Sequence, residues 1–171
     1  MINPLTRRIL TGTVVVISLS APACKKTTTT PAPPKPVAAF AATINGTAIS
    51  SGWIWVSNGN PGTGFVEISA GVSDASSDGI LLQANNVVAP TTVTLNSNAS
   101  LGSFGQYSSG PAATEIMYRT DASHTGTITF TQVDATNKLL SGTFTFTALQ
   151  YSPAGTPTVN VTNGSFSNIT W

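Results

Sequence analysis

The sequence has one cysteine, one histidine and few charged side chains, which make up 8% of its 171 residues. A single cysteine leaves no partner for a disulfide and excludes a zinc site built on thiolates. A single histidine leaves few ways to place a base beside a catalytic nucleophile. The chain also lacks a glycine-rich phosphate loop before a helix, so we expect no cofactor and no metal.

The cysteine, Cys24, follows a short apolar run that begins after two arginines. The run from Ile9 to Leu19 has about eleven residues, well short of the roughly 20 that a membrane-spanning helix needs. A basic start, a short apolar run and small residues before a cleavage point are typical of a secretory signal. We predict a lipoprotein signal peptide over residues 1–23, with conventional cleavage and no lipid as the alternative.

The predicted lipid attachment site is Cys24 itself. An unpaired thiol in an oxidising compartment is a liability, which attachment to a lipid removes. Two or more acyl chains, such as palmitate, hold a protein stably on a membrane. The expected partner is therefore a membrane, and the expected location is the bacterial cell envelope at the outer membrane, with the periplasmic and surface faces both open.

Residues 24–36 are rich in threonine and proline, whereas residues 37–171 have the composition of a folded domain. Proline-rich segments favour extended conformations, so we expect a semi-rigid tether followed by one domain. Within that domain two basic residues, Arg119 and Lys138, stand against six acidic ones, a net charge of −4. Such a domain does not bind nucleic acid by neutralising phosphates.

Apolar and polar residues alternate with a period of two along much of the domain. Ile128 and Phe130 alternate with Thr127 and Thr129, which puts one set in a core and the other in water. Because no stretch shows helical periodicity, we predict an all-β fold: an antiparallel meander of about eight to ten strands forming a β-sandwich or a flattened β-barrel. The predicted strands cover residues 40–45, 47–57, 64–73, 79–85, 91–96, 114–120, 126–134, 139–151 and 158–171.

Two turn signals bear on this topology. Residues 135–138 are expected to join two strands in a hairpin. The Asn163-Gly164 pair is either a second hairpin turn or a bulge within one long final strand, and we favour the bulge because the chain ends only a few residues later.

Several strand and turn segments resemble a known family. They are the opening FAATING at 40–46, GTITF at 126–130, LSGTFTFTA at 140–148 and the closing VTNGSF at 161–166. Together with the lipoprotein signal and the short tether, they resemble uncharacterised lipoproteins of Bacteroidota whose domain has no known function. The resemblance covers nearly all of residues 40–171 and implies a fold and a lineage, but no catalytic residues.

No group of residues makes a convincing catalytic site. His124 is close to Asp121 and Ser123, but residues in a single loop rarely reach the geometry of a triad. Asp74 and Asp78 share another loop and are expected to be solvated rather than paired for glycoside hydrolysis or calcium binding. We expect the protein not to be an enzyme, and we keep a hydrolase that uses Asp74, Asp78 or His124 as the rival interpretation.

The aromatic residues are the remaining candidates for ligand contact. Trp53 and Trp55 share one face of a predicted strand, where they would form either a stacking platform for sugar rings or part of the core. Strand aromatics are more often core residues, so we expect them to face inward. Phe104 and Tyr107, in a stretch rich in glycine and serine, are candidates for lining a pocket at a loop end, with a purely structural role as the favoured alternative.

These observations predict a lipid-anchored envelope protein whose domain has a non-catalytic binding or structural role. The alternative within binding is capture of a glycan or a small apolar ligand at a loop end or a barrel mouth.

Overall fold

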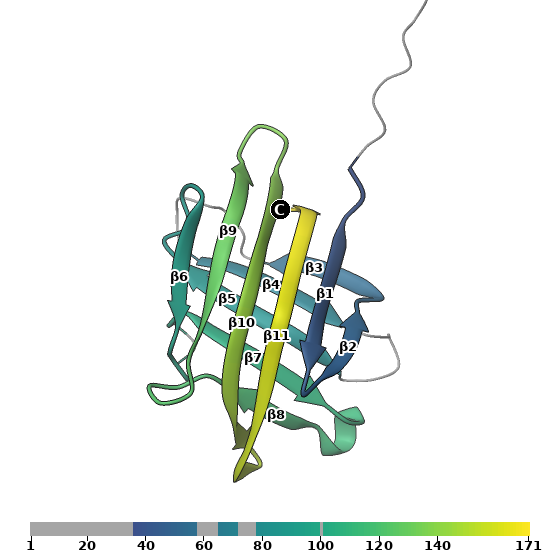
Figure 1. Ribbon diagram of the computed structural model, residues 1–171, viewed down its shortest axis with the longest axis vertical. Helices are drawn as coiled ribbons and strands as arrows, with labels where there is room; N and C mark the ends of the chain where they lie inside the picture. The colour runs from purple at the N-terminus through teal and green to yellow at the C-terminus, as the bar shows by residue number, and fades with distance from the viewer. Residues whose placement is uncertain (1–35, 58–64, 72–77, 100) are drawn as a thin grey trace, which may run out of the picture. The chain divides into compact units, whose positions relative to one another are not determined.

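The folded part of the computed structural model consists of two layers of antiparallel strands (Figure 1). The structure describes residues 36–57, 65–71, 78–99 and 101–171. The predicted signal peptide, Cys24 and the tether up to residue 35 lie outside the described residues. The strands are β1 (Ala39–Ile44), β2 (Thr47–Ser50), β3 (Trp53–Ser57), β4 (Phe65–Gly71), β5 (Gly79–Asn85), β6 (Thr91–Leu95), β7 (Phe104–Ser109), β8 (Ile116–Arg119), β9 (Gly126–Asp134), β10 (Leu139–Ser152) and β11 (Ala154–Thr170).

All eleven described strands belong to one curled sheet. Its hydrogen-bonded order is β2-β1-β11-β10-β8-β7-β5-β4-β3, and β9 pairs with both β10 and β6. One long strand joins the layers, because β10 pairs with β9 over Leu139–Phe146 and with β8 over Leu149–Ser152. The layer of β6, β9, β10, β11, β1 and β2 lies in front of the layer of β3, β4, β5, β7 and β8 (Figure 1). The result is a half-barrel in which three of the described strands, β2, β3 and β6, each pair with a single neighbour. The architecture confirms the all-β antiparallel prediction.

The core fills the space between the two layers. Ile128 and Phe130 are each 1% exposed, as their alternation with threonine predicts. The Phe130 ring meets that of Phe166 edge-on, with centroids 5.7 Å apart. Burial of each such side chain contributes about 1.5–3 kcal/mol, so the interlayer aromatics are a main source of stability.

The predicted strand over residues 47–57 is two strands, one in each layer. The chain crosses between the layers at two consecutive residues. The Ser51 N–H donates to the carbonyl of Phe40 in β1 over 3.1 Å, and the Gly52 N–H donates to the carbonyl of Gly71 in β4 over 2.8 Å. The crossing separates the short strand β2 from β3.

Strand β7 is not among the predicted strands, and it lies in the second layer between β5 and β8. Two of its inward-facing positions are Gly105 and Ser109, so its sequence lacks the alternation of apolar and polar residues that identifies a strand. Gly105 is required there because an added Cβ would lie 2.7 Å from the ring of Phe146. With β7 and the division at Ser51, the described strands number eleven rather than eight to ten.

The final strand is continuous, which confirms the bulge. The pairing of β11 with β1 shifts register between Ser165 and Thr162, and Asn163 has a positive φ of 51°. The hairpin predicted at residues 135–138 is also confirmed, since Asp134 of β9 pairs with Leu139 of β10.

Candidate functional site

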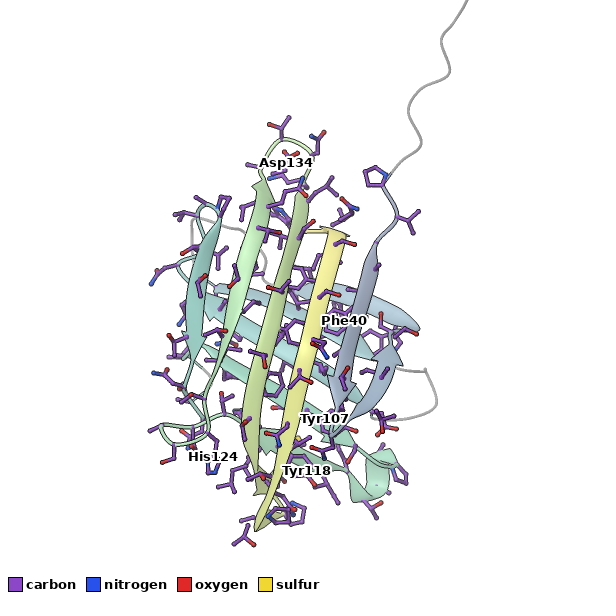
Figure 2. All side chains as sticks on the ribbon, in the orientation of Figure 1. Phe40, Tyr107, Tyr118, His124 and Asp134 are labelled. Atoms are coloured by element: carbon purple, nitrogen blue, oxygen red, sulfur yellow. The ribbon has the colours of Figure 1, made fainter. Side chains whose placement is uncertain are left out.

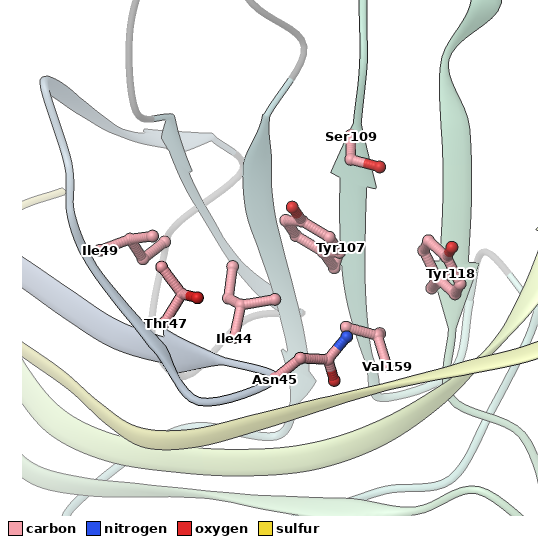
Figure 3. Close-up of a pocket in the computed structure, with 8 residues that line it drawn as sticks. All are labelled: Ile44, Asn45, Thr47, Ile49, Tyr107, Ser109, Tyr118 and Val159. Atoms are coloured by element: carbon pink, nitrogen blue, oxygen red, sulfur yellow. The ribbon is translucent and has the colours of Figure 1, made fainter.

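A cleft of about 390 Å³ opens between the two layers at one end of the half-barrel (Figure 3). The β1–β2 hairpin and β11 line one side, and β7 and β8 line the other. The lining residues are Ile44, Asn45, Thr47, Ile49, Tyr107, Ser109, Tyr118 and Val159. None of these side chains is charged, and the volume lies within the roughly 300–1,000 Å³ of small-molecule sites.

Two tyrosines form the aromatic wall of the cleft. Tyr107 of β7 and Tyr118 of β8 are cross-strand partners, and their rings stack with centroids 6.0 Å apart at 25°. Burial raises the pKa of the Tyr107 hydroxyl above its usual value, and the nearby carboxylate of Asp78 adds to this effect. The phenol is therefore protonated at neutral pH and can donate a hydrogen bond.

The opposite wall is held by the turn between β1 and β2. Asn45 adopts a positive φ of 46°, and its Oδ1 accepts a hydrogen bond of 2.9 Å from the backbone N–H of Asn160. This hydrogen bond joins the Asn45 side chain to β11 and holds the β1–β2 hairpin beside the cleft. Thr47 and Ser109 add hydroxyl groups, so the cleft combines apolar surface with neutral polar groups.

The structure places the two candidate pocket residues Phe104 and Tyr107 on different faces of β7. Residues three positions apart on a strand point to opposite faces. Tyr107 faces the cleft. Phe104 is 3% exposed on the other face of β7, beneath the guanidinium of Arg119 at 4.3 Å. Tyr118 was not predicted, because the sequence does not identify β7 as its partner strand.

Arg119 holds a polar cluster on the outer face of the second layer. Its Nε and Nη2 donate to Oε1 of Gln106 over 3.1 and 2.6 Å, and its Nη1 donates to the carbonyl of Asn98 over 3.1 Å. The guanidinium also lies 4.7 Å from the ring centroid of Tyr151. The two aromatic rings on either side and the amide oxygen fix this cation in place.

The tryptophans face outward, contrary to the prediction. Trp53 is 38% exposed and Trp55 is 67% exposed, whereas Ile54 and Val56 pack against the core. The reason is register: the two aliphatic residues pair with buried positions of β4, and the tryptophans pair with Gly71 and Ser69 on its outer side. The residues that β3 faces in β4 decide whether its tryptophans or its aliphatic residues are buried, and the size of the side chains does not.

His124 and Asp121 form a local pair within one turn. Their Nδ1 and Oδ1 atoms are 3.0 Å apart, and the same Oδ1 accepts 2.7 Å hydrogen bonds from the backbone N–H groups of Ser123 and His124. Burial alone would raise the pKa of Asp121, but these N–H groups and the histidine ring outweigh it and lower the pKa below its ordinary value.

The other residues of the rival hydrolase site lie elsewhere. Asp78 accepts a 3.0 Å hydrogen bond from the N–H of Gly110, at the end of β7 away from the Asp121 turn. Asp74 lies outside the described residues. Figure 2 shows His124 at the end of the folded domain opposite to Asp134, an acidic residue at the end of β9 that is not a member of the rival site. In the part of the chain that the structure describes, no three His, Cys, Asp or Glu side chains gather to hold a metal ion.

Comparison with known proteins identifies a family. Residues 62–170 match the model of a domain of unknown function, DUF6252. The chain belongs to the DUF6252 family. No curated protein and no solved structure matches it. Over the described ranges, no helix is long and apolar enough to cross a membrane.

The DUF6252 match confirms the resemblance to a domain of unknown function, while the Bacteroidota origin and the lipid anchor stay predictions. The matched region runs through Tyr107 and Tyr118. The β1–β2 hairpin on the opposite side of the cleft precedes it, as do Trp53 and Trp55.

Proposed function

We propose that this DUF6252 chain is a lipid-anchored envelope protein whose domain binds a small neutral ligand, without catalysis, in the cleft between the layers. The observation that carries the proposal is the stacked Tyr107–Tyr118 pair in the wall of an uncharged cleft of about 390 Å³. Ligand sites combine apolar surface with polar groups that fix orientation, and this cleft offers aliphatic and aromatic side chains beside neutral hydroxyl and amide groups.

The lining chemistry defines the ligand class. Ile44, Ile49 and Val159 supply aliphatic surface, and the two tyrosine rings supply flat aromatic surface. A charged ligand would leave water without gaining an ion pair, at a cost of several kcal/mol. The favoured ligand is therefore a small molecule with an apolar body and one or two neutral polar groups.

The absence of catalysis is part of the proposal. Asp78 and His124, the described residues of the rival hydrolase site, lie toward opposite ends of β7. Asp78 is bound to the N–H of Gly110, and His124 is paired with Asp121. A nucleophile and its base must lie within hydrogen-bond reach of each other.

Binding is tested with N-phenyl-1-naphthylamine, a neutral apolar dye that fluoresces when it leaves water. We expect the domain, residues 36–171, to enhance its fluorescence saturably. Thr47→Trp places bulk in the cleft from an exposed edge strand and is expected to weaken binding at least about tenfold, about 1.4 kcal/mol. Tyr151→Ala removes an aromatic from the outer face and serves as the control. Equal enhancement by all three proteins, or none by the wild type, would contradict the cleft as the binding site.

The anchor is tested separately. Metabolic labelling with an alkyne fatty acid should mark the full-length protein and leave Cys24→Ser unlabelled. Two acyl chains buried at about 0.8 kcal/mol per methylene should also keep the wild type in the membrane fraction. Equal labelling of both proteins would remove the anchor from the proposal.

A further inference from the structure

The outer face of the second layer presents two cross-strand rows that each begin with a tryptophan. The strand register gives the first row as Trp53, Gly71, Gly79 and Ser108, and the second as Trp55, Ser69, Leu81 and Gln106. Each row runs from the free edge β3 across β4 and β5 to β7. Exposed aromatics thus lie at one end of a face whose next positions carry small side chains or none.

The small residues make the face concave beside the tryptophan. A hollow of about 150 Å³ lies there, with Trp53, Ser69, Gly79, Leu81 and Ser108 among its lining residues. The indole of Trp53 lies over Gly71, where an added Cβ would come within 2.5 Å of its Nε1. The Trp53 ring therefore forms one side of the hollow.

The two indoles are positioned for consecutive flat groups. Residues two apart on a strand are about 7 Å apart and share one face, so two rings of a chain molecule could each lie against one indole. An exposed fraction of 67% for Trp55 leaves most of that side chain in contact with water in the free protein. Exposed aromatic surface at neighbouring positions of one face is a feature of interaction sites.

The charges of the side chains on this face indicate which class of ligand it binds. Among the described residues of this face, the ionic groups are already engaged: Glu67 accepts a hydrogen bond from the Ser57 hydroxyl, and Arg119 donates to Gln106. The other polar groups that the structure describes near the indoles are hydroxyls, an amide and backbone. Neutral hydrogen-bonding groups beside flat apolar rings complement a molecule that has hydroxyls at its rim and C–H groups on its faces.

We infer that the face of Trp53 and Trp55 binds an uncharged glycan, with β-linked hexose rings stacked on the indoles and hydroxyls at the serines. This site is distinct from the cleft of the proposed function, because Ser108 and Tyr107 are consecutive on β7 and point to opposite faces. A glycan site would let a tethered domain hold a polymer chain while its cleft remains open.

The test is a titration of the domain with cellohexaose and with chitohexaose, followed by tryptophan fluorescence and calorimetry. We expect saturable binding of at least one hexamer. Trp55→Ala should weaken it at least about tenfold, and Ser69→Lys, which fills the hollow with a charged chain, should weaken it similarly. Tyr118→Ala, in the cleft, should leave glycan binding unchanged and serves as the matched control. Circular dichroism of each variant checks that the fold is retained.

Three results would overturn the inference. One is no binding of either hexamer by the wild type. Another is binding that Trp55→Ala and Ser69→Lys both leave intact. The third is a wild-type dimer in sedimentation that Trp55→Ala dissociates, because the tryptophans would then serve self-association. Failure of the dye to bind the cleft would leave this inference standing, since the two sites share no lining residue.

Discussion

Trp53 and Gly71 pair across β3 and β4, and the indole occupies the space that a side chain at position 71 would need. An aromatic ring on the outer face of a sheet is thereby held against backbone. The pairing explains how an exposed tryptophan keeps one orientation on an edge strand, where neighbours are few.

Gly71→Ala is expected to destabilise the domain by about 1–3 kcal/mol, because the added methyl group must displace the ring. Trp53→Ala should remove most of that cost when the two changes are combined. The measurement is a double-mutant cycle from urea unfolding. Strictly additive effects would show that the ring and the glycine do not interact.

Arg119→Lys is expected to cost about 2 kcal/mol, because lysine cannot reproduce the paired N–H donors that meet Gln106 or the packing between Phe104 and Tyr151. Urea unfolding at neutral pH measures the effect. Glu115→Gln, four residues away, is the control and should change the unfolding free energy by less than about 0.5 kcal/mol. A larger loss in the control than in the lysine variant would mean that an ion pair holds this arginine.

Asp121→Ala is expected to cost about 1 kcal/mol at neutral pH, since two backbone N–H groups lose their acceptor. The pKa of Asp121 is lower in the folded state, so its contribution is present above the unfolded pKa of about 3.9 and is lost as the pH falls through the folded pKa. Urea midpoints measured from pH 7 to pH 2 should converge for the wild type and the variant. A constant gap at every pH would contradict this assignment, and Ser123→Ala, which keeps its backbone N–H, should behave as the wild type.

Asn163→Val is expected to destabilise the domain by about 1–2 kcal/mol, because a β-branched residue is strained at a φ of 51°. Asn163→Gly should be tolerated, since glycine adopts this conformation freely. Thermal unfolding followed by circular dichroism compares the two variants. Equal loss in both would show that the asparagine side chain, rather than the backbone conformation, maintains the bulge.

The predicted bulge and the 135–138 hairpin succeeded because both depend on local chemistry. At the bulge, asparagine before glycine favours a positive φ, and at residues 135–138 a short polar segment joins two alternating strands. The outward tryptophans and strand β7 could not be predicted in the same way. Trp53 is exposed because of the residue that it faces in β4. Residues 104–109 form β7 because they pair with β5 on one side and β8 on the other, although their own apolar alternation is weak.

In the candidate site, too, some features depend on local sequence and others on contacts between strands. Tyr107 could be singled out as an aromatic in a region of small residues. Its stacking on Tyr118 and the wall formed by Ile44 and Ile49 depend on strands distant in sequence. No periodicity within one segment encodes such a pairing.

By itself the sequence determined an all-β antiparallel domain, because alternation with a period of two and the lack of helical patterns are properties of each segment. The tertiary structure decided which face of β3 is buried, where the chain crosses between layers, and which residues enclose the cleft. Those outcomes depend on register between strands, and register depends on how side chains far apart in the chain fit together in one core.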